Sequence, residues 1–169
     1  MSDPAADARG FHTADLCDAH REDIEIALPL FSHFGGSRRF HGPIATITAF
    51  EDNRRVRETL GTAGNGRVLV VDGAGSTRVA LIGDQLAQLA VDNGWAGILV
   101  YGCVRDSEVL AQMPLGVLAI GTCPLRSRKE GTGSSDVPIR FAGLTFRPGQ
   151  HLYADPDGVV LANRDLLAG

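Results

Sequence analysis

Two pairs of residues combine a charged side chain with the boundary of an apolar segment. Arg105-Asp106 follows the apolar run GILVYG (97–102), and Gly83-Asp84 opens the pattern QLAQLAVDNG twenty-two residues earlier. Arginine can grip a carboxylate or an enolate oxygen with its planar fork. Aspartate offers a hard oxygen ligand suited to Mg²⁺ or Mn²⁺, which keep several waters and need few protein carboxylates. The alternative is a helix-capping aspartate beside a surface arginine.

Three short apolar runs predict the strands that must position these pairs. Such runs fit strands buried on both faces; they are RVLVVD (67–72), GILVYG (97–102) and GVLAIG (116–121). Leu86, Leu89 and Ala90 recur at helical spacing between the first two runs, and SEVLAQM predicts one or two helical turns after Arg105-Asp106. The resulting β-α-β-α-β order predicts a parallel sheet with right-handed crossovers. Ligands of open α/β sheets bind at the carboxyl ends of the strands, where both pairs fall.

The flanking segments predict further elements around this unit. We expect a strand at PIATITAF (43–50), an exposed helix at EDNRRVRETL (51–60), turns over 31–42, and a short helix over 13–20 capped at Thr13 or started from Asp15. The segment after residue 136 alternates short strands with turns and predicts a second β layer. Residues 1–12 are expected to form a flexible polar leader, and residues 13–169 a single domain.

The glycine-containing turn DGAGSTRVA (72–80) matches no nucleotide-binding motif. Arg78 stands where G-x-G-x-x-G needs its third glycine, and the lysine of a Walker motif is missing. Gly73 follows Asp72 directly, which is the wrong phase for the acidic-then-glycine pattern of many methyltransferases. A tight turn after a strand is therefore the expected role.

Histidines and the basic loop give weaker signals. The five histidines form no H-x-x-x-H or H-E-x-x-H pair, so the sequence does not predict a histidine metal site. The loop LRSRKEGTGSSD (125–136) carries Arg126, Arg128 and Lys129. A solvated loop is the simplest interpretation, and contact with an acidic partner is the functional alternative.

Composition narrows the class of protein. The chain has 169 residues, of which 44% are apolar and 21% charged, as in an ordinary globular domain. A net charge of -4 argues against direct binding to nucleic acid. The cysteines Cys17, Cys103 and Cys123 are odd in number and form no C-x-x-C, which indicates reduced thiols in a cytoplasmic protein. We expect no signal peptide and no membrane span, because no apolar stretch approaches ~18 residues.

Five ordered segments carry a resemblance to a known family. They are TADLCDAH, LFSHFGG, GPIATI, RVLVVDGAGSTRVALIGDQLAQLAVDNGWAGILVYGCVRD and AGLTFRPGQHLYADPDGVVL. From about Thr13 to about Ala162 the chain resembles the regulator of ribonuclease activity A family. That family includes the class II 4-hydroxy-4-methyl-2-oxoglutarate aldolases, which also decarboxylate oxaloacetate. The resemblance implies an α/β fold, a swivelling β/β/α domain, assembled as a homotrimer with its pyruvate pocket between subunits.

The resemblance also implies roles for individual residues. In the aldolases, backbone N–H groups of a Gly-led helix start hold the pyruvate carboxylate, and this motif falls on Gly83, Asp84, Gln85 and Leu86. The arginine that contacts pyruvate falls on Arg105. The aspartate that holds the divalent cation, Mg²⁺ or Mn²⁺, mostly through waters, falls on Asp106. We therefore expect Arg105 and Asp106 to be catalytic, with 4-hydroxy-4-methyl-2-oxoglutarate, oxaloacetate and pyruvate as substrates or products.

The same family contains a rival function. Its ribonuclease regulators lack the aspartate after the arginine, whereas this chain has Asp106. The alternative is a protein that binds and inhibits ribonuclease E without metal or catalysis, with the basic loop 125–136 as the relevant surface. A trimeric scaffold with a vestigial site is a third interpretation. Some longer aldolases use an acidic residue from a C-terminal extension, and the ending DLLAG offers no match for it.

Overall fold

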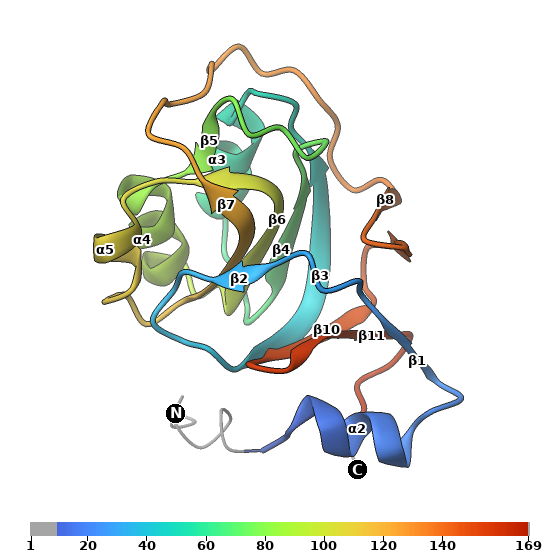
Figure 1. Cartoon of the computed structure of the whole chain (residues 1–169). Helices are drawn as coiled ribbons and strands as arrows, with labels where there is room; N and C mark the ends of the chain where they lie inside the picture. The colour runs from blue at the N-terminus through green and yellow to red at the C-terminus, as the bar shows by residue number, and fades with distance from the viewer. Residues whose placement is uncertain (1–9, 169) are drawn as a thin grey trace.

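The structure, a computed structural model, describes residues 10–168 (Figure 1). Its helices are α2 (Thr13–Ala19), α3 (Arg54–Leu60), α4 (Asp84–Asp92) and α5 (Ser107–Leu110). Its strands are β1 (Ile24–Ile26), β2 (Ser32–His33), β3 (Phe40–Thr48), β4 (Val68–Asp72), β5 (Ala80–Ile82), β6 (Gly97–Val104), β7 (Gly116–Thr122), β8 (Ile139–Phe141), β9 (Leu144–Phe146), β10 (His151–Asp155) and β11 (Gly158–Ala162). No helix among these described residues is long and apolar enough to cross a membrane.

Most strands join one large mixed sheet. Its order is β1-β11-β10-β3-β4-β6-β7-β2, with β5 paired to β6, and β8 and β9 form a separate two-stranded sheet. The pairs β3–β4, β4–β6 and β6–β7 are parallel. The first part of β3 instead pairs antiparallel with β10, so this long strand joins the parallel unit to the C-terminal strands. The predicted α/β class, with a central parallel unit and a second β layer, is confirmed.

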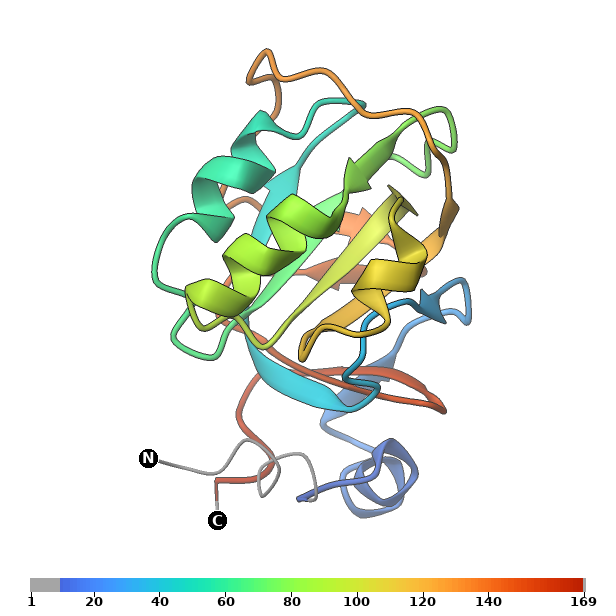
Figure 2. The same cartoon turned by 90° about the vertical axis from the view of Figure 1, so that its left-hand side faces the viewer.

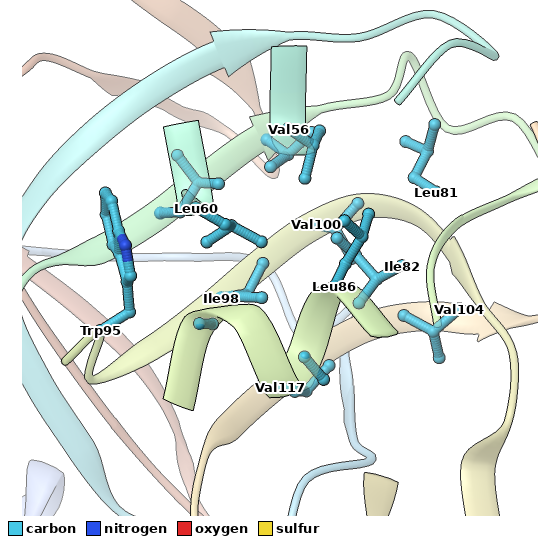
Figure 3. Close-up of a cluster of buried hydrophobic side chains, with 14 of the residues drawn as sticks. Val56, Leu60, Leu81, Ile82, Leu86, Trp95, Ile98, Val100, Val104 and Val117 are labelled. Atoms are coloured by element: carbon cyan, nitrogen blue, oxygen red, sulfur yellow. The ribbon is translucent and has the colours of Figure 1, made fainter. Parts of the chain in front are cut away.

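Apolar side chains fill both faces of the parallel strands. Helices α3, α4 and α5 cover one face (Figure 2). There Val56 and Leu60 of α3 and Leu86 of α4 pack onto β6 residues such as Ile98 (Figure 3). On the opposite face, side chains of β3, β4 and β6 pack against the β8–β9 hairpin and β10–β11. Burial on both faces explains why these strands are continuous apolar runs in the sequence.

Two predicted elements begin at other residues than expected, and some short strands were not predicted. The predicted strand 43–50 is β3, which begins at Phe40, because the Gly- and Ser-rich segment before it hid its first residues. The predicted helix 51–60 begins only at Arg54, since Glu51 has a φ of 55° and residues 51–53 turn the chain. Three strands were not predicted, β1, β2 and β5, because two or three residues carry too little periodicity.

The start of the described chain is held by the C-terminal strands. Helix α2 lies where it was predicted, but the expected cap at Thr13 or Asp15 is wrong, because His12 occupies the N-cap position without a side-chain hydrogen bond. The Thr13 hydroxyl instead donates to Asp155 Oδ1 at 2.6 Å. Phe11, within the range predicted as a leader, is buried against His41 and Tyr153, while residues 1–9 lie outside the described residues.

Two glycines allow the sheet to pack against Phe40. Gly97 and Gly116 are register partners on β6 and β7, and a Cβ on either would overlap the Phe40 ring. That ring is only 5% exposed, so it has little room to move away.

We expect Gly116→Ala to lower the free energy of unfolding by roughly 1–3 kcal/mol, because it over-packs a buried contact. Urea unfolding followed by circular dichroism measures the change. The same substitution in a Phe40→Ala background should cost much less. An equal cost in both backgrounds would show that the Phe40 ring is not the obstacle.

Candidate active site

The parallel pairing of β5 with β6 brings the two sequence pairs together. Arg105 N–H donates to Ile82 O at 2.9 Å, so β5 and β6 end at the same edge of the sheet. Gly83 and the start of α4 follow β5 directly, and Arg105-Asp106 follows β6. Residues separated by twenty-two positions therefore lie in contact, where the sequence pattern predicted them.

Asp106 serves helix α4 and not its own helix. Its Oδ2 accepts a hydrogen bond from Asp84 N–H at 3.0 Å and lies 4.0 Å from Arg105 Nε. It makes no side-chain capping bond to α5, the helix that follows it. The Arg105 and Asp106 side chains are 39% and 36% exposed, so both remain accessible to a ligand. Asp106 is therefore a helix-capping aspartate, but for α4 and not for the helix that follows it.

The backbone at Gly83 and at Asp106 is suited to the contact between Asp106 and α4. A Cβ at Gly83 would lie 2.8 Å from Asp106 Oδ2 and 3.4 Å from Arg105 Nε, so a side chain here would displace the Asp106 carboxylate from its contact with α4. Asp106 itself has a φ of 56° and a ψ of 39°, a left-handed conformation that costs energy for a non-glycine residue. Strain of this kind clusters at functional sites, and here it turns the carboxylate toward α4.

The start of α4 is suited to bind an anion. The first N–H groups of a helix have no acceptor within the helix, and the helix dipole makes that end partly positive. Asp84 N–H is taken by Asp106, and Gln85 and Leu86 supply the next N–H groups. A carboxylate ligand at this position would meet both N–H groups and the Arg105 side chain.

Side chains from three other segments complete a pocket of about 140 Å³. Its lining consists of Asn53, Arg57, Ala80, Gly83, Asp84, Gln85, Leu86, Arg105, Arg126 and Lys129. Four of these residues are cationic and one, Asp84, is a carboxylate, although the whole chain has a net charge of -4. The pocket is thus a local positive region suited to an acidic ligand.

Sequence reasoning missed part of this lining. Asn53 and Arg57 carried no signal, because nothing local to residues 51–60 shows that this segment faces the start of α4. Arg126 and Lys129 were noted only as a basic loop for an acidic partner. Asn53 Nδ2 donates to Leu81 O at 3.2 Å, while its Oδ1 is buried and has no hydrogen-bond partner among the described residues. An orphaned acceptor beside a pocket is available to a ligand hydroxyl.

The donor set fits a weakly held Mg²⁺ or Mn²⁺. No group of three or more His, Cys, Asp or Glu in residues 10–168 is arranged to hold a metal ion. A cation beside Asp106 would therefore take most of its ligands from water and from substrate oxygens, which is how Mg²⁺ is commonly bound. The partly exposed Asp106 carboxylate leaves room for such ligands.

The glycine turn after β4 is closed by its own chain. A Cβ at Gly75 would lie 2.9 Å from Tyr101 Cζ, and one at Gly73 would lie 2.7 Å from Tyr101 O. The glycines therefore allow a close packing contact with β6, which agrees with the predicted tight turn.

Comparison with known proteins identifies the family. The family profile "RraA-like: Aldolase/RraA" matches residues 13–161. The chain belongs to the Aldolase/RraA family. A family relative from Laribacter hongkongensis is 57% identical over 157 residues, which cover 93% of this chain and 99% of that protein. It carries the name "Putative 4-hydroxy-4-methyl-2-oxoglutarate aldolase". The resemblance stated from the sequence is confirmed.

Solved structures agree with this Aldolase/RraA assignment. One from Geobacillus kaustophilus has a TM-score of 0.92 and 54% identity, covers 94% of this chain and 99% of its own, and is named an S-adenosylmethionine:2-dimethylmenaquinone methyltransferase. Another, the RNA-processing inhibitor RraA from Thermus thermophilis, has a TM-score of 0.88 and 45% identity, with 91% and 93% covered. The fold is thus shared by solved proteins with two different names.

Proposed function

We propose that this chain is a divalent-cation-dependent lyase that cleaves 4-hydroxy-4-methyl-2-oxoglutarate into two molecules of pyruvate. Oxaloacetate decarboxylation is a side activity of the same site. The observation that carries the proposal is the contact of Arg105 and Asp106 with the start of α4 inside a cationic pocket. The names of relatives such as the Laribacter hongkongensis protein support it. A methyltransferase function has no comparable support, since the glycine turn is packed against Tyr101.

The substrate and the pocket have complementary charge. 4-Hydroxy-4-methyl-2-oxoglutarate carries a carboxylate at each end, and a keto group lies next to one of them. We place the keto-acid end at Gln85 N–H, Leu86 N–H and the Arg105 guanidinium. The second carboxylate then faces Arg126 and Lys129 across the pocket. Charge-assisted contacts at both ends favour a dianion over a neutral molecule of similar size.

Cleavage requires a place for the electron pair of the broken bond. The C3–C4 bond breaks, its electrons enter the keto-acid end to form pyruvate enolate, and the C4 hydroxyl loses its proton as a second keto group forms. When bound at Asp106, the cation supplies Lewis-acid polarisation of the keto-acid oxygens. Arg105 places fixed positive charge beside the developing enolate oxygen.

The remaining steps involve a hydroxyl and its proton. Asn53 Oδ1, which lacks a partner among the described residues, can accept a hydrogen bond from the C4 hydroxyl and orient it. We assign the departing proton to a water molecule, because no described side chain is placed as a base. Protonation of C3 of the enolate from water then gives the second pyruvate. Oxaloacetate reaches the same enolate by losing its C4 carboxylate as CO₂, so one site serves both reactions.

Substitution of the central pair tests the proposal. We expect Asp106→Asn to lower kcat/KM for 4-hydroxy-4-methyl-2-oxoglutarate by about 100-fold, because it removes the charge that a hard cation needs. Arg105→Lys should lose about tenfold, because a point charge replaces the planar fork. Pyruvate release with Mg²⁺, corrected for the rate of Mg²⁺ alone, measures both effects, and EDTA should abolish the wild-type rate. Wild-type turnover in a folded Asp106→Asn protein would refute this assignment.

A second candidate is inhibition of a ribonuclease, which the likeness to the RraA structure favours. Such an inhibitor would act through surface contacts, with the loop 125–136 as the basic surface. It would need neither Asp106 nor a cation. Ribonuclease E activity measured with and without this protein and its Asp106→Asn variant separates the two functions, because inhibition should be unchanged by that substitution.

We also propose that the chain assembles as a homotrimer. Besides Phe50, the large exposed apolar side chains form two groups along the chain: one in and after β1 (Ile26, Leu28, Leu30) and one in the segments that follow β6 and β7 (Val109, Leu125). A closed ring of three copies uses two different surfaces of each chain, one against the other. Contact between these regions would bury both and bring a neighbouring copy toward the pocket edge.

We expect the wild-type protein to have the mass of three chains in light scattering at micromolar concentration. Leu28→Asp, at a side chain that is 54% exposed, should shift the mass toward one chain because a buried, unpaired charge is costly. Glu22→Gln, an exposed change on the segment leading to β1, is the control and should remain trimeric. A wild-type protein with the mass of a single chain would refute the assembly.

A further inference from the structure

A buried carboxylate outside the pocket holds the loop that reaches into it. Asp52 is 2% exposed, and none of the ion pairs in residues 10–168 includes it. Its oxygens instead accept hydrogen bonds from three consecutive backbone N–H groups, those of Glu130 at 2.9 Å, Gly131 at 3.0 Å and Thr132 at 3.4 Å. Arg54 N–H donates at 3.1 Å from the other side. The carboxylate thus binds a stretch of loop seventy-eight to eighty residues away.

This anchored stretch carries two cations of the pocket. Lys129 immediately precedes the bound N–H groups, Arg126 lies three residues earlier, and both line the pocket. Backbone bonds continue the attachment, because Arg128 N–H donates to Glu51 O at 3.1 Å and Asn53 N–H donates to Arg128 O at 3.0 Å. The turn that contains Asp52 therefore sets the position of the basic loop relative to Asn53, which lines the same pocket.

The carboxylate is held in its charged form. Burial by itself would raise the pKa of Asp52, but the N–H groups of Arg54, Gly131, Thr132 and Glu130 outweigh it and lower the pKa below its usual value. Hydrogen bonds to a charged acceptor are stronger than those between neutral groups. At neutral pH, the ionised Asp52 therefore forms stronger hydrogen bonds to the loop than a neutral side chain of the same shape would.

We propose that Asp52 is a positioning residue: by fixing residues 130–132 it holds Lys129 and Arg126 where the second carboxylate of the substrate binds. This inference rests on the proposed function for its substrate, and on the hydrogen bonds of Asp52 for its structural part. Asp52 touches no substrate. Its removal should weaken binding of a two-carboxylate substrate while leaving the keto-acid end, at Arg105 and the start of α4, unchanged.

The first arm of the test measures how readily the loop opens. Trypsin cleaves after arginine and lysine, so Arg126, Arg128 and Lys129 make the loop a substrate whenever it opens. Asp52→Asn should raise the initial rate of cleavage at these positions by about tenfold, with the melting temperature measured alongside. Asp136→Asn, an exposed change of the same kind at the end of this loop, is the control and should leave the rate unchanged. An unchanged rate in Asp52→Asn would overturn the anchoring role.

The second arm measures the two ends of the pocket separately. Asp52→Asn should raise KM for 4-hydroxy-4-methyl-2-oxoglutarate by about tenfold, with kcat and the inhibition constant of pyruvate changed less than about twofold. A double Arg126→Ala, Lys129→Ala variant should show the same effect, and adding Asp52→Asn to it should cause little further loss. An equal loss of pyruvate affinity, or fully additive losses, would overturn the positioning role.

If Asp52→Asn does not fold, a substitution in the loop itself provides the same test. Gly131 has a φ of +93° and donates its N–H to Asp52, so Gly131→Ala strains this contact from the loop side while Asp52 itself is unchanged. It should raise both the rate of trypsin cleavage and the KM, as Asp52→Asn does. A folded Gly131→Ala protein that cleaves faster but keeps its KM would overturn the link to substrate. Absence of lyase activity in the wild-type protein would overturn both the proposed function and the role of Asp52 in substrate binding. The trypsin experiment would still show whether Asp52 holds the loop.

Discussion

The pocket depends on one hydrogen bond, from Asp84 N–H to Asp106 Oδ2, and on the strand pairing that makes it possible. Parallel pairing of β5 with β6 fixes Arg105 beside Ile82, so the chain segments leaving both strands must run next to each other. A side chain at Gly83 would collide with Asp106, and Asp106 reaches α4 only from a left-handed backbone conformation. Backbone geometry thus joins a helix N-terminus, a carboxylate and a guanidinium within one small volume.

The charges around the pocket favour an acidic ligand. The chain as a whole is acidic, yet Arg57, Arg105, Arg126 and Lys129 converge on the same pocket. Like charges repel, so such a cluster is costly unless a ligand or fixed carboxylates offset it. Asp84 and Asp106 offset it in part, and a dianionic keto acid would complete the balance. Arg105 lies at the sheet edge, whereas Arg126 and Lys129 lie on a loop, so the contacts that we propose for the two ends of the substrate come from different kinds of element.

The sequence predicted those parts of the site that are encoded locally. The runs at β4, β6 and β7 and the helical spacing in α4 have strong periodicity, because each element is buried on a wide face. They were enough to place Gly83 and Arg105-Asp106 at the same sheet edge. The contributions of Asn53, Arg57 and the basic loop could not be predicted, because they depend on contacts such as Asp52 with Glu130, seventy-eight residues apart. Strand β5 was also missed. Its three residues are too few to show a periodicity, and it is a strand because it pairs with β6.

The central claim is that the start of α4, Arg105 and Asp106 form one site for a keto acid and a divalent cation. Oxalate is a planar dianion that resembles pyruvate enolate, so a crystal structure with oxalate and Mn²⁺ tests the claim most directly. We expect one oxalate carboxylate within hydrogen-bond distance of Gln85 N–H, Leu86 N–H and the Arg105 guanidinium, with Mn²⁺ located by its anomalous signal between oxalate and Asp106. Oxalate and Mn²⁺ bound away from these residues at saturating concentration, with the pocket left to solvent, would contradict it.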